Sequence, residues 1–163
     1  MTKALRSKII LFVGVFFSML SLQAQVTTNS GSGLAPTYAS LDPAITALNA
    51  ATITSPVVIT LTAANPQTVP AGGYELRAEG TAINTIKIIG NGNTITASSS
   101  LTPGALNDGL FKVIGGDYIS IESFVLKEAV SNTITDAGTN NMTEWGVAVL
   151  YASPTNGSQN VTI

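Results

Sequence analysis

The sequence predicts an all-β fold in which short strands stack on one another in parallel, preceded by one helix. Short stretches of alternating apolar residues recur along the chain, separated by bends of small residues. The pattern of Ile86–Ile88 returns at Ile119–Ile121 and again at Val161–Ile163, with spacings that drift, as in stacked repeats. Charge is sparse and Thr, Ser, Asn, Ala and Gly are abundant, which suits strands joined by tight turns.

Residues 1–25 have the layout of a secretory signal peptide. Lys3, Arg6 and Lys8 form a positive segment, and an uncharged, mostly apolar run follows over residues 9–22. This run is shorter than the roughly 20 residues that a membrane-spanning helix needs. We expect export with removal of the segment and no membrane insertion afterwards. An uncleaved N-terminal anchor is the alternative.

Removal of the signal peptide leaves four basic and nine acidic residues, so the remaining chain has a formal net charge of −5. It lacks the clustered Lys and Arg that nucleic acid requires, so we expect no nucleic-acid partner. The sequence contains no cysteine and no histidine. Disulfides, His-based metal sites and Ser-His-Asp triads are therefore excluded. We expect no cofactor and no metal site.

The folded domain is expected to begin after a linker. Residues 26–37 consist largely of small residues without periodicity, which predicts a flexible connection. The domain is then expected over residues 38–163.

One helix is expected, over Ser40–Ala51. Its apolar residues fall on one face at helical spacing, and they are Leu41, Ala44, Ile45 and Leu48. Ser40 or Asp42 can cap the helix, and Pro43 suits its first turn. A single apolar face indicates that the helix packs against the rest of the fold.

Strands are expected over the alternating segments that follow. The first covers Pro56–Ala63, a short one lies around Tyr74–Leu76, and the next contains Ile86 and Ile88, with Ile95 after a bend. In the later segments eight apolar residues are expected to point inward, namely Phe111, Val113, Ile119, Ile121, Val147, Val149, Val161 and Ile163.

A hairpin is the alternative for Thr85–Thr96. Asn91-Gly92 between alternating apolar residues is a strong hairpin motif, and it would favour an antiparallel sandwich. Two features favour stacked parallel strands instead. Ile88-Ile89 places apolar side chains on both faces, and the similar segment at Ile119 has no Asn-Gly in the corresponding position.

Two stretches, NTIKIIGNGNTI and DYISIESFVL, resemble rungs of right-handed parallel β-helices of the pectate-lyase-like superfamily. The helix and first strand resemble the cap that opens such domains in large secreted bacterial proteins. The resemblance implies a right-handed parallel β-helix solenoid with an N-terminal capping helix. The alternating pattern is still running at Asn160–Ile163, so we expect an incomplete, C-terminally truncated domain. A short terminal strand tucked into a sheet is the alternative.

No catalytic residue is assigned. Lyases of that superfamily use clustered aspartates for calcium with an Arg or Lys base, and its glycosidases use close carboxylates. The acidic residues here form no such pair. Asp108 and Asp117 each lie beside glycine, where Asp normally serves a turn. Glu122 and Lys127 are expected on a solvated outer face, and Arg77 has no evident carboxylate partner.

Three aromatic residues are candidates for stacking on sugar rings, namely Tyr118, Trp145 and Tyr151. Packing at corners of the fold is the alternative for them. We therefore expect a non-catalytic, secreted or cell-surface structural module of the adhesin type in a bacterium, with polysaccharide or cell-surface glycan as a candidate partner. The alternatives are a glycan-binding module and the N-terminal portion of a carbohydrate-active enzyme whose catalytic part lies beyond residue 163. Whether the chain is an enzyme is left open.

Overall fold

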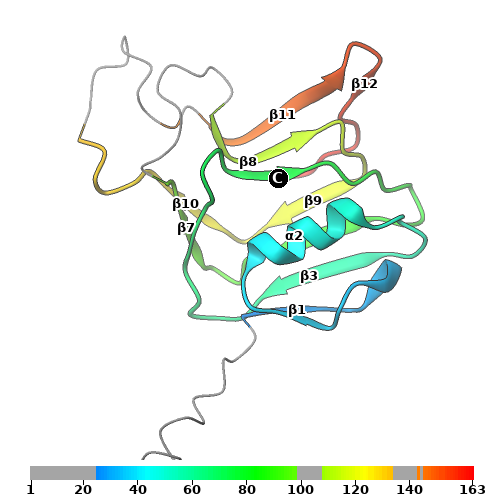
Figure 1. The fold of residues 1–163 in the computed structure, drawn as a ribbon, viewed down its shortest axis with the longest axis horizontal. Helices are drawn as coiled ribbons and strands as arrows, with labels where there is room; N and C mark the ends of the chain where they lie inside the picture. Colours follow the sequence, from blue (N-terminus) through cyan, green and yellow to red (C-terminus); the bar gives the residue numbers. More distant parts are fainter. Residues whose placement is uncertain (1–24, 99–107, 134–142, 144) are drawn as a thin grey trace, which may run out of the picture.

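The structure is a computed structural model of the 163-residue chain, and it describes residues 25–98, 108–133, 143 and 145–163. These residues form mostly β-strands, with one α-helix and one short 3-10 helix (Figure 1). The expected signal peptide lies, apart from Gln25, outside the described residues.

The strands enter three sheets in turn. The first set is β3 (Val57–Leu61), β4 (Gln67–Thr68) and β5 (Tyr74–Leu76). The second set, each strand parallel to one of the first, is β6 (Ile86–Ile89), β7 (Thr94–Thr96) and β8 (Gly109–Ile114). The third set, parallel to the second, is β9 (Ile119–Glu122), β10 (Val125–Lys127) and β11 (Trp145–Ser153). We call each set a pass.

The parallel pairing expected between the two best repeats is present. Ile86 lies opposite Ile119 and Ile88 opposite Ile121 in the β6–β9 ladder. The hairpin alternative is wrong, because β6 and β7 lie in different sheets. Asn91 and Gly92 do form a turn with positive φ angles of 51° and 75°.

Contacts to both neighbouring passes explain why this Asn-Gly turn makes no hairpin. The Asn91 side chain donates to the carbonyl of Leu61 (2.8 Å) in the first pass, and the Gly92 N–H donates to that of Ser123 (2.7 Å) in the third. The turn thus redirects the chain from one sheet to the next.

A right-handed parallel β-helix is not supported, because two of the three sheets are mixed. β1 (Val26–Thr28) pairs antiparallel with β3 and with β2 (Thr37–Tyr38), and β12 (Asn156–Gly157) pairs antiparallel with β11. No sheet of the described residues closes into a solenoid. Alternation of apolar residues reports which side chains are buried and not the direction of the neighbouring strand. The sequence pattern therefore could not reveal these antiparallel strands.

The stretch expected to be a flexible linker is part of the fold. Val26 is fully buried and lies opposite Leu61 in the β1–β3 ladder. The short 3-10 helix η1 (Gly31–Gly33) follows, and a Cβ on Gly31 would lie 2.0 Å from the carbonyl oxygen of Pro56. The small residues that suggested mobility permit this close backbone approach instead.

The helix α2 (Leu41–Ala50) is where the sequence predicts it, and its buried residues are those expected. Ser40 occupies the N-cap position without a side-chain hydrogen bond to the helix. The Leu41 N–H is instead 3.4 Å from Oε1 of Gln67. In Figure 1 the helix lies across the strands, and it contacts β2 and β5.

The core contains a row of aromatic rings, one from each pass. The ring centroids of Tyr74 and Phe111 are 5.3 Å apart, and those of Phe111 and Phe124 are 5.2 Å apart. Burial, together with the charge of Asp42, raises the pKa of Tyr74 to about 12. The tyrosine is therefore neutral at physiological pH and acts as a core residue.

The eight residues expected to point inward divide into two groups. Phe111, Val113, Ile119 and Ile121 are buried, as expected. Val147 and Val161 are only partly buried, Val149 is 48% exposed and Ile163 is 70% exposed. Val147 and Val161 still pack against the core, as expected. The expectation of burial was wrong for Val149 and Ile163, because little of the described chain covers their outer side.

Candidate functional site

The three aromatic candidates do not come together. Tyr118 lies at the corner before β9 and is half-buried, whereas Trp145 and Tyr151 lie at different points of β11 and are 52% and 78% exposed. A Cβ on Gly157 would lie 2.7 Å from the Tyr151 ring, so that ring rests against the β12 strand. Of the three, only Tyr118 lines one of the two cavities described below.

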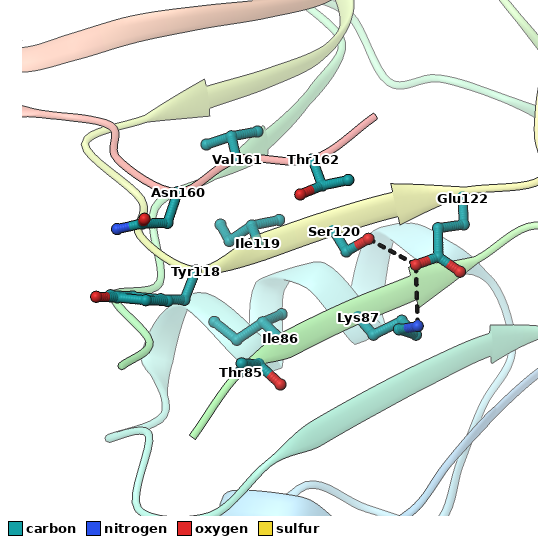
Figure 2. A pocket seen from close by; sticks show the side chains of 10 residues that line it. All are labelled: Thr85, Ile86, Lys87, Tyr118, Ile119, Ser120, Glu122, Asn160, Val161 and Thr162. Atoms are coloured by element: carbon teal, nitrogen blue, oxygen red, sulfur yellow. Dashed lines mark hydrogen bonds and ion pairs between the residues drawn. The ribbon is translucent and has the colours of Figure 1, made fainter. Parts of the chain in front are cut away.

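The first cavity is an open groove of about 500 Å³ on the sheet that contains β6 and β9 (Figure 2). We call it the sheet groove. Its lining residues are Thr85, Ile86, Lys87, Tyr118, Ile119, Ser120, Glu122, Asn160, Val161 and Thr162. They come from β6, from β9, from the residue before each of these strands and from the segment after β12.

Strand register places the polar residues of the groove. Lys87 lies opposite Ser120 in the β6–β9 ladder, and Ser120 lies opposite Thr162 in a further parallel bridge. These residues alternate with inward-facing ones, so they share the outer face of the sheet. Two backbone hydrogen bonds fix the last segment, from Ile121 N–H to Thr162 (3.0 Å) and from Thr162 N–H to Ile119 (2.9 Å).

An ion pair occupies one end of the groove. Lys87 Nζ is 2.9 Å from Oε1 of Glu122, and the Ser120 hydroxyl donates to the same oxygen at 2.7 Å. The Ser120 hydrogen bond and then the Lys87 ammonium lower the pKa of Glu122. The carboxylate is therefore ionised at neutral pH, and its charge is balanced within the groove.

Tyr118 and Asn160 occupy the other end, as Figure 2 shows. Both have a left-handed backbone conformation, with φ of 53°. Tyr118 N–H donates to the carbonyl of Gln159 (3.0 Å), and its own carbonyl accepts from Ile86 N–H (2.9 Å). The tyrosine backbone is thus held by the neighbouring segments on both sides, which fixes where its side chain leaves the backbone.

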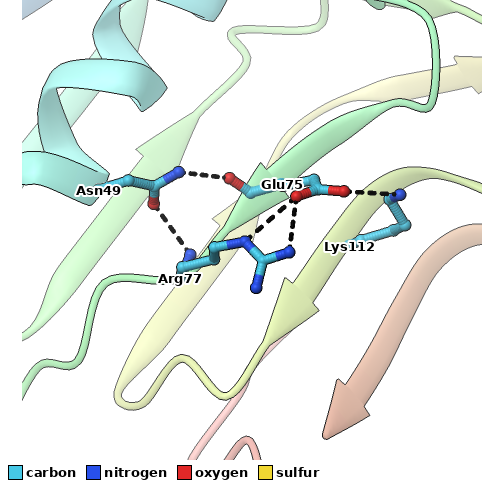
Figure 3. A network of polar contacts seen from close by, with 4 residues as sticks. All are labelled: Asn49, Glu75, Arg77 and Lys112. Atoms are coloured by element: carbon cyan, nitrogen blue, oxygen red, sulfur yellow. Dashed lines mark hydrogen bonds and ion pairs between the residues drawn. The ribbon is translucent and has the colours of Figure 1, made fainter. Parts of the chain in front are cut away.

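A second polar cluster lies on the outer face of β5 and β8 (Figure 3). Glu75 accepts from Lys112 at 3.0 Å and from the Arg77 guanidinium at 2.8 Å, so the expectation that Arg77 lacks a carboxylate partner is wrong. The Lys112 hydrogen bond is the main cause of the lowered pKa of Glu75. Glu75 and Lys112 lie opposite each other on neighbouring strands. The cluster therefore stabilises the pairing of β5 with β8.

The remaining acidic candidates do not form a site. Asp117 lies in parallel bridges with Glu79 and Gln159, and its Oδ1 accepts from Gln159 N–H at 2.7 Å, so its side chain links neighbouring strands and does not close the local turn expected for it. Asp108 is buried, and burial raises the pKa of its carboxyl against the opposing charge of Lys112. Neither lines the two cavities. Among the described residues, no group of three or more acidic residues has the arrangement to hold a metal ion.

The second cavity, of about 390 Å³, opens on the outer side of the third pass. Five of its lining residues are apolar, namely Ile121, Phe124, Leu126, Val147 and Ile163. We call these five, together with Val149, the apolar end. Apart from the buried Ile121, its side chains are partly or fully exposed, whereas their counterparts in the first two passes are covered by the next strand.

Comparison of this chain with protein-family models, curated proteins and solved structures finds no match. The resemblance to the pectate-lyase-like superfamily is therefore corrected: neither the mixed sheets nor the comparisons support it. None of the described helices is long and apolar enough to cross a membrane.

Sequence reasoning missed the sheet groove and its ion pair. It named Tyr118 as a stacking candidate, but it placed Glu122 on a solvated outer face and gave no binding role to Asn160 or Thr162. The repeat offset that aligns Ile119 with Val161 also aligns Tyr118 with Asn160 and Ser120 with Thr162. Extending that alignment to the polar residues would have indicated a shared outer face.

Proposed function

We propose that this chain is a non-catalytic structural module, of the adhesin type, on the outside of a bacterial cell. The observation that carries the proposal is the use of charged side chains to link neighbouring strands. Lys87 pairs with Glu122 across β6 and β9, and Lys112 with Glu75 across β8 and β5. Charges placed in this way stabilise a sheet surface.

The protonation of these groups also favours a structural role. A glycosidase needs a carboxylic acid whose pKa is raised, so that it can donate a proton to the leaving group. The pKa values of Glu75 and Glu122 are lowered by their basic and hydroxyl neighbours. Asp108 has a raised pKa but lies outside both cavities. None of these three carboxyl groups combines the required pKa with an accessible position.

The location outside the cell rests on the sequence of residues 1–25. Their positive start and uncharged apolar run have the layout of an export sequence. The net charge of −5 on the remaining chain and its many small polar residues suit a soluble surface outside the cell.

Expression of the full chain in a bacterium tests both parts of the proposal. We expect the mature protein outside the cytoplasm, with an N-terminus near residue 26 by N-terminal sequencing. We also expect it to release neither reducing ends nor unsaturated products from neutral or acidic polysaccharides, with or without calcium. Retention in the cytoplasm with residues 1–25 intact would overturn the location, and reproducible product release would overturn the non-catalytic role.

A further inference from the structure

We propose that the sheet groove is a binding site for a neutral oligosaccharide, with Tyr118 as its stacking platform. The proposal rests on the adhesin-type function and names the ligand class for one site on the module. It is carried by the shape of the groove, the conformation of Tyr118, the polar groups along its floor and the balance of its charges.

The groove has the size and surface of a small polar-ligand site. Its volume of about 500 Å³ lies within the range of cavities that hold small molecules. Ile86 and Ile119 line it but are 0% and 1% exposed. A ligand would therefore contact the polar residues, the Tyr118 side chain and the partly buried Val161.

Tyr118 is held in an unusual conformation for a bulky residue. A left-handed backbone is disfavoured for side chains with a Cβ, and such strain recurs at functional sites. Hydrogen bonds to the strands on both sides maintain it here, through Gln159 and Ile86. The result is a half-buried ring at one end of a groove, and an aromatic face suits the apolar C–H face of a sugar ring.

Polar groups suited to sugar hydroxyls line the remaining length. Among the described residues, no hydrogen bond occupies the Asn160 side-chain amide or the hydroxyls of Thr85 and Thr162. An amide both donates and accepts, as do hydroxyls, so these groups match the mixed donors and acceptors of a carbohydrate. Asn160 is exposed and lies next to Tyr118, which places a stacking surface and a hydrogen-bonding group side by side (Figure 2).

The balance of charge selects a neutral ligand. Lys87 is paired with Glu122 at 2.9 Å, so the lining of the groove holds no uncompensated charge. An acidic polysaccharide would in addition meet the net negative charge of the mature chain. A neutral sugar meets neither obstacle.

Substitution of Tyr118 by glycine gives a selective test. Glycine tolerates the positive φ of this position, so the variant removes the ring without demanding a new backbone. Asn160→Ala removes the neighbouring amide. Ser123→Gly is the matched control, because Ser123 also has a positive φ (59°) and lies outside the sheet groove. Tyr151→Ala controls for the loss of an exposed aromatic residue.

The measurement is affinity electrophoresis of the exported full chain in gels containing dextran, mannan, xylan or a soluble β-glucan, with polygalacturonate as the acidic comparison. We expect at least one neutral polymer to retard the protein, with little change between low and moderate salt. Tyr118→Gly should weaken that retardation about tenfold, in keeping with the loss of one aromatic contact, whereas the two controls should leave it unchanged.

Several outcomes would overturn the proposal. They are the absence of retardation by every neutral polymer, equal retardation of Tyr118→Gly and the parent protein, or preferential, salt-sensitive binding of polygalacturonate. Binding of an extended peptide that Tyr118→Gly abolishes, without binding of any neutral polymer, would replace the sugar by a protein partner. An exported, catalytically inert protein that binds no neutral polymer would refute the groove site alone and leave the structural function standing.

Discussion

The Asn49 side chain completes the open edge of β5 at Glu75. Its amide nitrogen donates to the Glu75 carbonyl at 2.7 Å, and its amide oxygen accepts from the Arg77 N–H at 2.9 Å (Figure 3). β5 is the edge strand of its sheet, so these backbone groups have no neighbouring strand to bond. The helix thus supplies the two hydrogen bonds that a further strand would have made.

Replacement of Asn49 should therefore destabilise the fold. Asn49→Ala introduces a good helix former, so the helix itself is not weakened. The variant leaves one carbonyl and one N–H at the edge of β5 without a protein partner. We expect a loss of about 1–3 kcal/mol in the free energy of unfolding, measured by urea denaturation. Thr46→Ala, on the exposed side of the same helix, should have a much smaller effect. Equal losses in the two variants would contradict the role of Asn49.

Gly90 should not tolerate a side chain, for a steric reason. A Cβ at this position would lie 2.4 Å from Cδ1 of Phe124 and 2.5 Å from the carbonyl oxygen of Ser123. Gly90→Ala should lower the free energy of unfolding by about 1–3 kcal/mol, the usual range for adding a group to a well-packed core. Gly92→Ala is the comparison, since it meets open space and is strained only by its positive φ. We expect the Gly90 variant to have the lower urea midpoint, and the reverse order would show that the ring of Phe124 moves aside freely.

Much of the fold could be predicted because the spacing of apolar residues in the sequence reports which side chains are buried. The helix and its four buried residues follow from helical spacing, and the β6–β9 pairing follows from matched alternating segments. The antiparallel strand β1 could not be predicted in this way. The strand has only three residues and lies in a stretch of small residues. Val26 is buried because Leu61 lies opposite it, and this long-range contact leaves no local sequence pattern.

The candidate site was less predictable than the fold. Aromatic character identified Tyr118 as a possible binding residue, but Trp145 and Tyr151 had the same character and lie elsewhere. What distinguishes Tyr118 is its backbone conformation and its neighbour Asn160, and both depend on contacts between strands of successive passes. Ion pairing between Lys87 and Glu122 likewise depends on register across two strands.

The Glu75 cluster should make stability depend on pH in the acidic range. The pKa of Glu75 is lowered in the folded chain, so the unfolded chain binds a proton first as the pH falls. The stabilisation is therefore present above the ordinary Glu pKa of 4.5 and is lost as the pH falls through the lower folded value. We expect Glu75→Gln to flatten this part of the profile of urea midpoint against pH.

The size of this effect should be modest, at about 1 kcal/mol near neutral pH, because the Glu75 side chain is 41% exposed and solvent screens the pair. Glu79→Gln is the control, since Glu79 is exposed and its side chain pairs with the neutral Asn156. Parallel pH profiles for the parent protein and Glu75→Gln would show that the ion pairs to Lys112 and Arg77 contribute nothing to stability.

The apolar end should cause residues 26–163, produced alone, to self-associate. Val149 and Ile163 are 48% and 70% exposed, and Ile163 lines a cavity whose other residues are mainly apolar. Exposed apolar patches and uncovered strands favour association. We expect the sedimentation coefficient of the mature protein to rise with concentration, and Val149→Thr combined with Ile163→Ser to reduce that rise. Threonine keeps the β-branched shape that suits a strand.

Ile83→Ser is the matched control, because Ile83 is 83% exposed but does not belong to the apolar end. A parent protein that sediments as a monomer at all concentrations, or an equal response to Ile83→Ser, would show that this surface does not drive association.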